Sequence, residues 1–135
     1  MIRFEDRIKV RYYDCDHMGV MHHSNYLRYF ESARDDMMES WGYPLEQCEK
    51  DGIFLPVVKA EIRYHRPAVS GEVVRITAEI PEVPLAKILV KQQMFNAKEE
   101  LCCEAVITLG FLSAATGRPV RCPEALSALM ERLSH

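Results

Sequence analysis

The sequence has 135 residues, of which 48% are hydrophobic and 27% are charged, a composition typical of one folded domain rather than of a disordered or fibrous chain. Its formal net charge of −3 gives no global field that would attract a polyanion, and no basic patch is visible, so we expect no nucleic-acid partner. No apolar run approaches the ~18 residues of a membrane span, and the N-terminus lacks a signal-peptide core. We therefore expect a single cytoplasmic domain over residues 1–135, with no membrane partner.

The cysteine content indicates reduced thiols. The number of cysteines is odd and no two of them form a CxxC pair, so neither a disulfide framework nor a thiolate zinc site is indicated. The five residues are Cys15, Cys48, Cys102, Cys103 and Cys122.

A strand and a long helix are predicted in the first third of the chain. Residues 4–12 alternate between apolar and charged side chains, which favours a half-buried strand. From Tyr26 to Trp41 apolar residues recur every three to four positions, the pattern of an amphipathic helix. Ser24 or Asn25 can cap its start, and a glycine at position 42 marks its end.

Four more strands are predicted after this helix. They lie at 55–65, 72–80, 87–95 and 101–112, with a short helix near 45–50 and a last helix over 124–133. Because short connections join these strands, consecutive ones should pair antiparallel, which gives an α+β arrangement. The long helix must then cover one face of the sheet.

The densest group of reactive side chains lies between the first strand and the long helix. Residues 14–26 read DCDHMGVMHHSNY and contain two aspartates and three histidines. One interpretation is a metal site, but His22 and His23 are adjacent and no HxH or HxxxH spacing occurs, so we expect no metal. A second interpretation is that Asp14 and Asp16 only shape a turn.

A third interpretation is hydrolysis. A carboxylate on this loop would act as base or nucleophile, and the helix N-terminus just beyond it would stabilise negative charge. A thioester carbonyl placed there would meet free backbone N–H groups near His23 and Ser24, at the positive end of the helix dipole. No side-chain donor for the oxyanion is then required.

The segment resembles the 4-hydroxybenzoyl-CoA thioesterase family and its relatives, including the acyl-CoA thioesterases of the Tol-Pal-associated type. The matching residues run from Cys15-Asp16 through Gly19 and Val20-Met21 to His23 and Tyr26, and continue as YFESAR at 29–34 and YHRPA at 64–68. Three features depart from the family pattern: Met21, His17, and a turn at 83–87 without the usual arginine and serine. Lys87 is the cation that remains at that turn to reach a phosphate.

The resemblance implies a hotdog fold, in which a five-stranded antiparallel sheet wraps a long central helix, and a homodimer or homotetramer with active sites at the interface. It implies hydrolysis of an acyl-CoA thioester to free acid and coenzyme A, without a metal or organic cofactor. Asp16 would be nucleophile or general base. The backbone N–H of His23 would polarise the carbonyl, while its imidazole would assist water or orient Asp16.

Two other functions are compatible with the fold. An acyl-thioester dehydratase requires a different His and Asp pattern on the helix, which is absent. A non-catalytic acyl-CoA-binding or scaffold protein would keep the fold without activity, although the intact context of Asp16 argues against it. The acyl group stays open between short aliphatic, long aliphatic and aromatic acids, as does the choice of coenzyme A or acyl carrier protein as thiol carrier.

The remaining candidates are expected to be structural. Asp14 should face away from Asp16. Glu31 and Arg34, three apart on the helix, should form a surface ion pair. Cys15 has no basic partner that would activate its thiol. Three cations of the second strand and its end could meet coenzyme A phosphates, but such charges usually form a solvated face: Lys59, Arg63 and Arg66.

Overall fold

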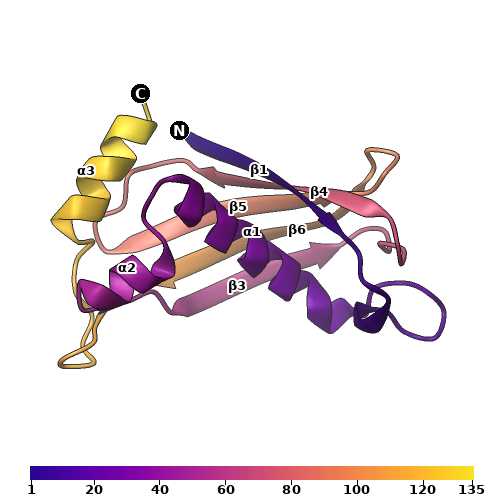
Figure 1. Cartoon of the computed structure of the whole chain (residues 1–135), viewed down its shortest axis with the longest axis horizontal. Coiled ribbons are helices and arrows are strands. Elements are labelled where there is room, and N and C mark those ends of the chain that lie inside the picture. Colours follow the sequence, from indigo (N-terminus) through magenta and orange to yellow (C-terminus); the bar gives the residue numbers. More distant parts are fainter.

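The computed structural model describes all 135 residues as a long helix, α1, lying across a curved antiparallel sheet (Figure 1). The predicted long helix and the five predicted strands are all present, displaced by a few residues at their ends. The helices are α1 (Tyr26–Ser40), α2 (Leu45–Lys50) and α3 (Glu124–Leu133), with 3-10 turns η1 (Tyr12–Asp14) and η2 (His23–Asn25). The strands are β1 (Ile2–Lys9), β2 (Ile53–Phe54), β3 (Val57–Tyr64), β4 (Val73–Ile80), β5 (Lys87–Phe95), β6 (Leu101–Gly110) and β7 (Leu112–Ser113).

The main sheet has the strand order β1-β4-β5-β6-β3, and every neighbouring pair is antiparallel. The expectation that consecutive strands pair is correct for β4 with β5 and for β5 with β6. It is wrong for β3, which pairs with β6 and not with β4. The antiparallel five-stranded sheet around a long helix is the predicted α+β architecture, and that prediction is confirmed.

The path of residues 65–72 explains the wrong pairing. This segment makes no tight turn back onto β3, because its backbone bonds to the loop that precedes α1. Ala68 accepts from the N–H of Met21 at 2.8 Å, and Ser70 donates to the carbonyl of Gly19 at 2.9 Å. The chain is thereby carried across one end of the sheet, where β4 pairs with β1 and β3 is left at the opposite edge.

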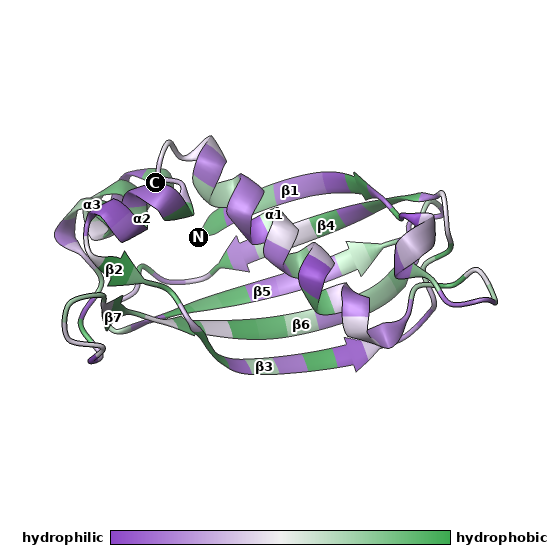
Figure 2. Ribbon diagram, turned by 60° about the horizontal axis from the view of Figure 1, so that its bottom comes forward, coloured by the Kyte–Doolittle hydropathy of each residue, from purple (hydrophilic) through white to green (hydrophobic).

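The core lies between α1 and the inward-facing side of the sheet. Along β4, buried Val74, Ile76, Ala78 and Ile80 alternate with more exposed residues, as period-two burial requires. Phe30 of α1 is completely buried against this face, which contributes roughly 1.5–3 kcal/mol. Figure 2 shows hydrophilic residues on the outer surface of α1 and hydrophobic bands through the sheet beneath it.

The smaller elements close one end of this arrangement. α2 and α3 lie together at the end of the sheet where the N-terminus also lies (Figure 1). Leu126 and Met130 bury the inner side of α3. β2 pairs with β7 in a separate two-stranded sheet. None of the helices is both long and apolar enough to cross a membrane.

A carboxyl pair joins β1 to α1. Asp6 lies on β1 with one oxygen, Oδ2, fully buried and without a donor in the chain. Burial, and then the neighbouring Asp36 carboxyl of α1, raise the pKa of Asp6 to about 6. Two carboxyl groups can share a hydrogen bond only while one of them is protonated. This contact therefore stabilises the fold below the ordinary pKa of 3.8 and ceases to do so as the pH rises through about 6.

We expect Asp6→Asn to stabilise the protein at neutral pH, because an amide can donate to Asp36 without carrying a charge. The gain should be about 1 kcal/mol, less than the pKa shift alone implies since Asp6 is partly solvated. Urea unfolding across a pH series measures it. The two proteins should converge below the ordinary carboxyl pKa, and an advantage that is the same at all pH values would contradict the shared proton.

Candidate active site

The loop between β1 and α1 is folded by its own backbone. Asp16 donates its N–H to the carbonyl of Val20 at 2.9 Å and accepts at its own carbonyl from the N–H of Gly19 at 3.0 Å. Gly19 has φ 81°, in the left-handed region where a side chain would be strained. Cys15 and Met21 form an isolated β-bridge across the base of the turn. Asp16 is therefore held at the start of a tight turn.

The Asp16 carboxylate is positioned but not neutralised. Its Oδ1 accepts the N–H of Met18 at 2.8 Å, which is the turn geometry that the second interpretation of the sequence anticipated. No other hydrogen bond and no ion pair reaches the carboxylate, and the side chain is only half-buried. One oxygen is thus fixed by the loop, while the other is free to act on a bound molecule.

The entry to α1 leaves one backbone donor free. Three N–H groups around it are used: His22 donates to the carbonyl of Asp14 at 3.0 Å, Ser24 to Nδ1 of His22 at 3.3 Å, and Asn25 to the carbonyl of His22 at 2.9 Å. The N–H of His23 has no acceptor in the chain. Because it lies at the start of η2 and α1, it is a donor at the positive end of the helix dipole.

The helix cap differs from the prediction. Neither Ser24 nor Asn25 caps α1 with its side chain; instead the imidazole of His22 caps η2 by accepting from Ser24. Asn25 turns its amide toward the preceding loop and donates to the carbonyl of Asp14 at 2.8 Å. The reason is the inserted 3-10 turn, which moves the first capping position back to His22.

Tyr64 of β3 supports this helix entry, and the sequence contained it only as part of the YHRPA motif. Its hydroxyl donates to the carbonyl of His23 at 3.0 Å. Its ring packs edge-on against Tyr26, with centroids 5.3 Å apart, and against the exposed imidazole of His23 at 6.3 Å. No hydrogen bond joins the His23 imidazole to Asp16.

Asp14 is a buried anchor for the loop. Its Oδ2 accepts from the Tyr29 hydroxyl at 2.6 Å, and its Oδ1 lies 3.3 Å from Nη1 of Arg28. The Tyr29 oxygen in turn accepts the N–H of Arg11 at 3.0 Å. Burial, together with the adjacent Asp14, raises the pKa of Tyr29 to about 12. This agrees with a structural role for Asp14.

Other sequence candidates lie outside this cluster. Arg34 is wrongly predicted as a surface partner of Glu31: it is buried and donates to Oε1 of Gln92 at 2.9 Å. Lys59 and Arg66 pair with carboxylates on the exposed surface, as a solvated face requires. Burial raises the pKa of the Cys15 thiol, which disfavours the thiolate. No three His, Cys, Asp or Glu side chains cluster closely enough to hold a metal ion.

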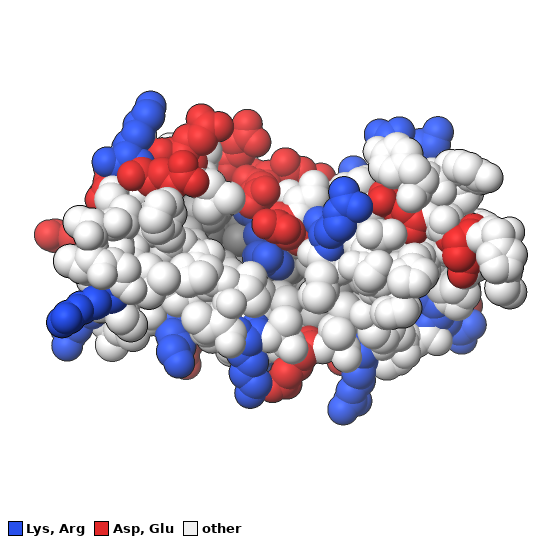
Figure 3. Space-filling view, turned by 90° about the horizontal axis from the view of Figure 1, so that it is seen from below, with Lys and Arg blue, Asp and Glu red and all other residues white.

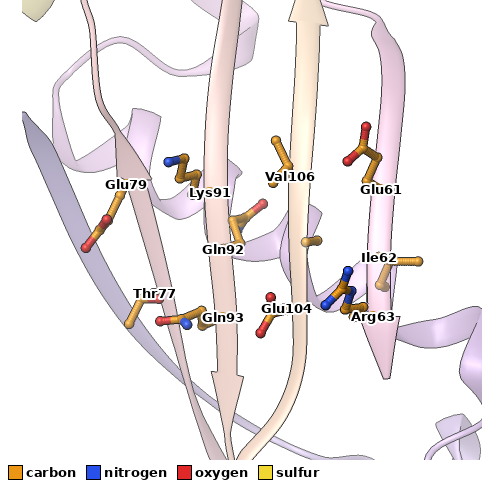
Figure 4. Close-up of a pocket in the computed structure, with 11 residues that line it drawn as sticks. Glu61, Ile62, Arg63, Thr77, Glu79, Lys91, Gln92, Gln93, Glu104 and Val106 are labelled. Atoms are coloured by element: carbon orange, nitrogen blue, oxygen red, sulfur yellow. The ribbon is translucent and has the colours of Figure 1, made fainter. Parts of the chain in front are cut away.

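A hollow of about 440 Å³ lies away from Asp16, on the sheet face opposite α1 (Figure 4). Two cross-strand rows of polar side chains line most of it. In one, Glu79 lies opposite Lys91; in the other, Glu104 lies between Gln93 and Arg63. The hollow is open and contains both positive and negative charges. It has no counterpart of the Asp16 carboxylate and the free His23 N–H on the loop before α1.

The sheet order and the crossing helix define a hotdog fold. A model of the thioesterase-like superfamily matches residues 10–130, and the chain belongs to that family. The predicted resemblance and fold are confirmed.

Three relatives illustrate the similarity. The acyl-CoA thioesterase YbgC of Helicobacter pylori is 28% identical over 136 residues, covering 94% of this chain and 99% of that protein. A relative from Aquifex aeolicus is 32% identical over 77 residues, which is 57% of this chain and 60% of the relative. The DHNA-CoA thioesterase structure from Staphylococcus aureus superposes with a TM-score of 0.91 at 27% identity, covering 99% of this chain and 92% of that one.

We expect Tyr29→Phe to destabilise the fold by ~1–3 kcal/mol, since the buried Asp14 carboxylate loses its shortest hydrogen bond. Urea denaturation measures the free energy of unfolding. Tyr12→Phe is the matched control, because that ring is 82% exposed and the change should fall within about 0.5 kcal/mol. Equal effects of the two changes would show that Asp14 does not depend on Tyr29.

Proposed function

We propose that the protein hydrolyses acyl-CoA thioesters to free acid and coenzyme A. The observation that carries the proposal is the pairing, on one loop, of an oriented but un-neutralised Asp16 carboxylate with the unpartnered His23 N–H at a helix start. This is the combination of nucleophile or base with oxyanion donor that acyl transfer requires. Membership of the thioesterase-like superfamily and the named activity of the YbgC relative support it.

The reaction follows from these two groups. The thioester carbonyl oxygen would accept the His23 N–H, and a donor of this kind is worth roughly 10²–10³ in rate. Asp16 would either attack the carbonyl carbon, giving a mixed anhydride as the C–S bond breaks and the thiolate leaves, or remove a proton from an attacking water. In the first route water then hydrolyses the anhydride and restores the carboxylate. Both routes end in the same acid and thiol.

We assign the His23 imidazole an assisting role. It is exposed at the helix entry and lies against His22, with ring centroids 4.3 Å apart. From there it can orient an incoming water or take up a proton released in the reaction. The chain as a whole, residues 1–135, is proposed to act as one thioesterase domain.

We expect Asp16→Asn to lower kcat/KM by at least ~100-fold, the scale of a lost general base or nucleophile. Free-thiol release from short, long and aromatic acyl-CoAs measures it and also identifies the acyl class. Glu49→Gln, an exposed carboxylate of α2, is the control and should retain activity. Saturable acyl-CoA binding by the wild type with no turnover of any substrate would instead favour a non-catalytic binding protein.

The protein is also proposed to work as a homodimer, or as a tetramer built from two dimers. β3 lies at the edge of the sheet, so one side of its backbone has no neighbouring strand. Its apolar residues Val57, Val58 and Tyr64 are each about half exposed, an unusual amount for a strand edge left in water. Because Tyr64 also supports His23, a second copy seated on this edge would lie next to the active site.

We expect Val58→Lys to give a monomer, because Val58 is 53% exposed and a charge on an edge strand opposes strand pairing. Size-exclusion chromatography with light scattering measures the mass. Val73→Lys, at the start of β4 and 46% exposed, is the control and should keep the mass of the wild type. A wild-type protein that is monomeric at micromolar concentration would contradict the proposal.

A further inference from the structure

Arg34 is a buried cation without an anion. Only 8% of the residue is exposed, and Nη1 donates to Oε1 of Gln92 at 2.9 Å. Gln92 is itself fixed, because its Nε2 donates to the carbonyl of Phe30 at 3.0 Å. Burial lowers the pKa of Arg34, while Glu31 and Asp35 on the surface of α1 act in the opposite direction without coming within ion-pair distance. A neutral amide is thus its one partner.

Part of the guanidinium has no partner in the chain. Arginine carries five N–H donors, and Arg34 makes a single hydrogen bond here, from Nη1. Nε and Nη2 of Arg34 are not fully enclosed in the core. Only one fully enclosed side-chain nitrogen or oxygen lacks a hydrogen-bond partner, and that atom is Oδ2 of Asp6. These donors therefore meet an opening. A charged group this deeply buried is stabilised when something hydrogen-bonds to it there.

The opening lies on the β3 side of α1. Asp36 neighbours Asp6 of β1, and Tyr29 accepts the N–H of Arg11 just beyond the end of this strand, so their flank of the helix faces β1. Leu27 and Arg34, seven residues apart and hence on one line along the helix, occupy the other flank. β1 and β3 are the opposite edges of the sheet, so this second flank faces β3. Figure 3 views the molecule from that side and shows a hollow beneath the acidic surface of α1.

The opposite wall of this hollow is apolar. Ile62 of β3 pairs with Ala105, which is buried on the face that α1 covers, so its side chain points to the same face. Ala60 and Tyr64 share this orientation and are exposed, although the ring of Tyr64 contacts Tyr26 at the start of α1. Leu27, on the same flank of α1 as Arg34, is 38% exposed. A ligand here would meet hydrocarbon along its length and the free donors of Arg34 at one end.

The hollow and the proposed reaction centre lie along the same helix. His23 and Arg34 are eleven residues apart, a rise of roughly 16 Å. A helical side chain leans toward the helix N-terminus, so the guanidinium of Arg34 lies closer to His23 than the backbone of Arg34 does. An acyl group whose carbonyl is held at the His23 N–H could therefore run along the β3 flank of α1 and bring its far end to Arg34.

We propose that Arg34 is a specificity-determining residue, whose free donors bind a hydroxyl or keto oxygen at the far end of a medium-length acyl chain. The inference rests on the proposed thioesterase function and names its substrate class: acyl thioesters oxygenated at the end distant from the sulfur. Glu31 and Asp35 add negative charge nearby, which favours a neutral oxygen over a carboxylate. A simple alkyl chain would leave the donors unpaired and is bound less well.

The test compares octanoyl-CoA with ω-hydroxyoctanoyl-CoA, using wild type, Arg34→Met and the surface control Arg3→Met. The wild type and Arg3→Met should favour the hydroxylated substrate in kcat/KM by at least about 10-fold. Arg34→Met, which keeps a chain of similar length, should lose this preference while retaining activity on octanoyl-CoA. A wild-type ratio near one, or an equal loss on both substrates in a folded Arg34→Met dimer, would overturn the proposal.

Two further measurements keep the outcome unambiguous. Dissociation of the Arg34→Met dimer in light scattering would mean that Arg34 serves assembly, and would also overturn the proposal. Calorimetry on Asp16→Asn gives the Kd ratio of the same two ligands without turnover. If the wild type hydrolyses neither thioester, the thioesterase proposal fails, whereas the Kd ratio with and without the added change Arg34→Met still decides the role of Arg34.

Discussion

The hydrogen bond from the Tyr29 hydroxyl to the buried Asp14 carboxylate is the contact on which the loop geometry depends. A carboxylate this deeply buried requires donors, and Tyr29 supplies the shortest one from α1. The backbone carbonyl of Asp14 accepts from the N–H of His22 and from the side-chain amide of Asn25. Asp14 therefore joins η1 to the start of η2 and to α1, and the free His23 N–H lies within that arrangement.

Asp14 and Asp16 show how environment separates two identical side chains. They lie two residues apart, yet one is enclosed by a hydroxyl and a guanidinium while the other accepts a single backbone N–H and keeps a free oxygen. An enclosed carboxylate has no lone pair available for a substrate. The half-buried one does, and its single hydrogen bond fixes its direction without removing its charge. The first builds the site, and the second is suited to act in it.

Periodicity predicted the elements well because burial on one face repeats along each of them. The first strand was displaced by about two residues, and α1 was placed to within one. Strand order was not predictable in the same way, since the position of β3 depends on backbone bonds made by residues 65–72 to a distant loop. Of the two backbone N–H groups expected to be free, that of His23 has no acceptor in the chain, whereas that of Ser24 donates to His22. The capping role of His22 depends on a 3-10 turn that no sequence pattern indicated.

Arg34 was misassigned because a charged side chain three residues from a glutamate suggests a surface pair. Its position four residues after Phe30, about 40° around the helix, places it beside the buried face instead. That flank is not sealed because β3 is the last strand of the sheet and most of its residues are exposed. The same uncovered edge provides the apolar surface for a second copy and the hollow that reaches Arg34. A partner seated on β3 would close this hollow over its ligand, so assembly and acyl selection would depend on one feature of the strand order.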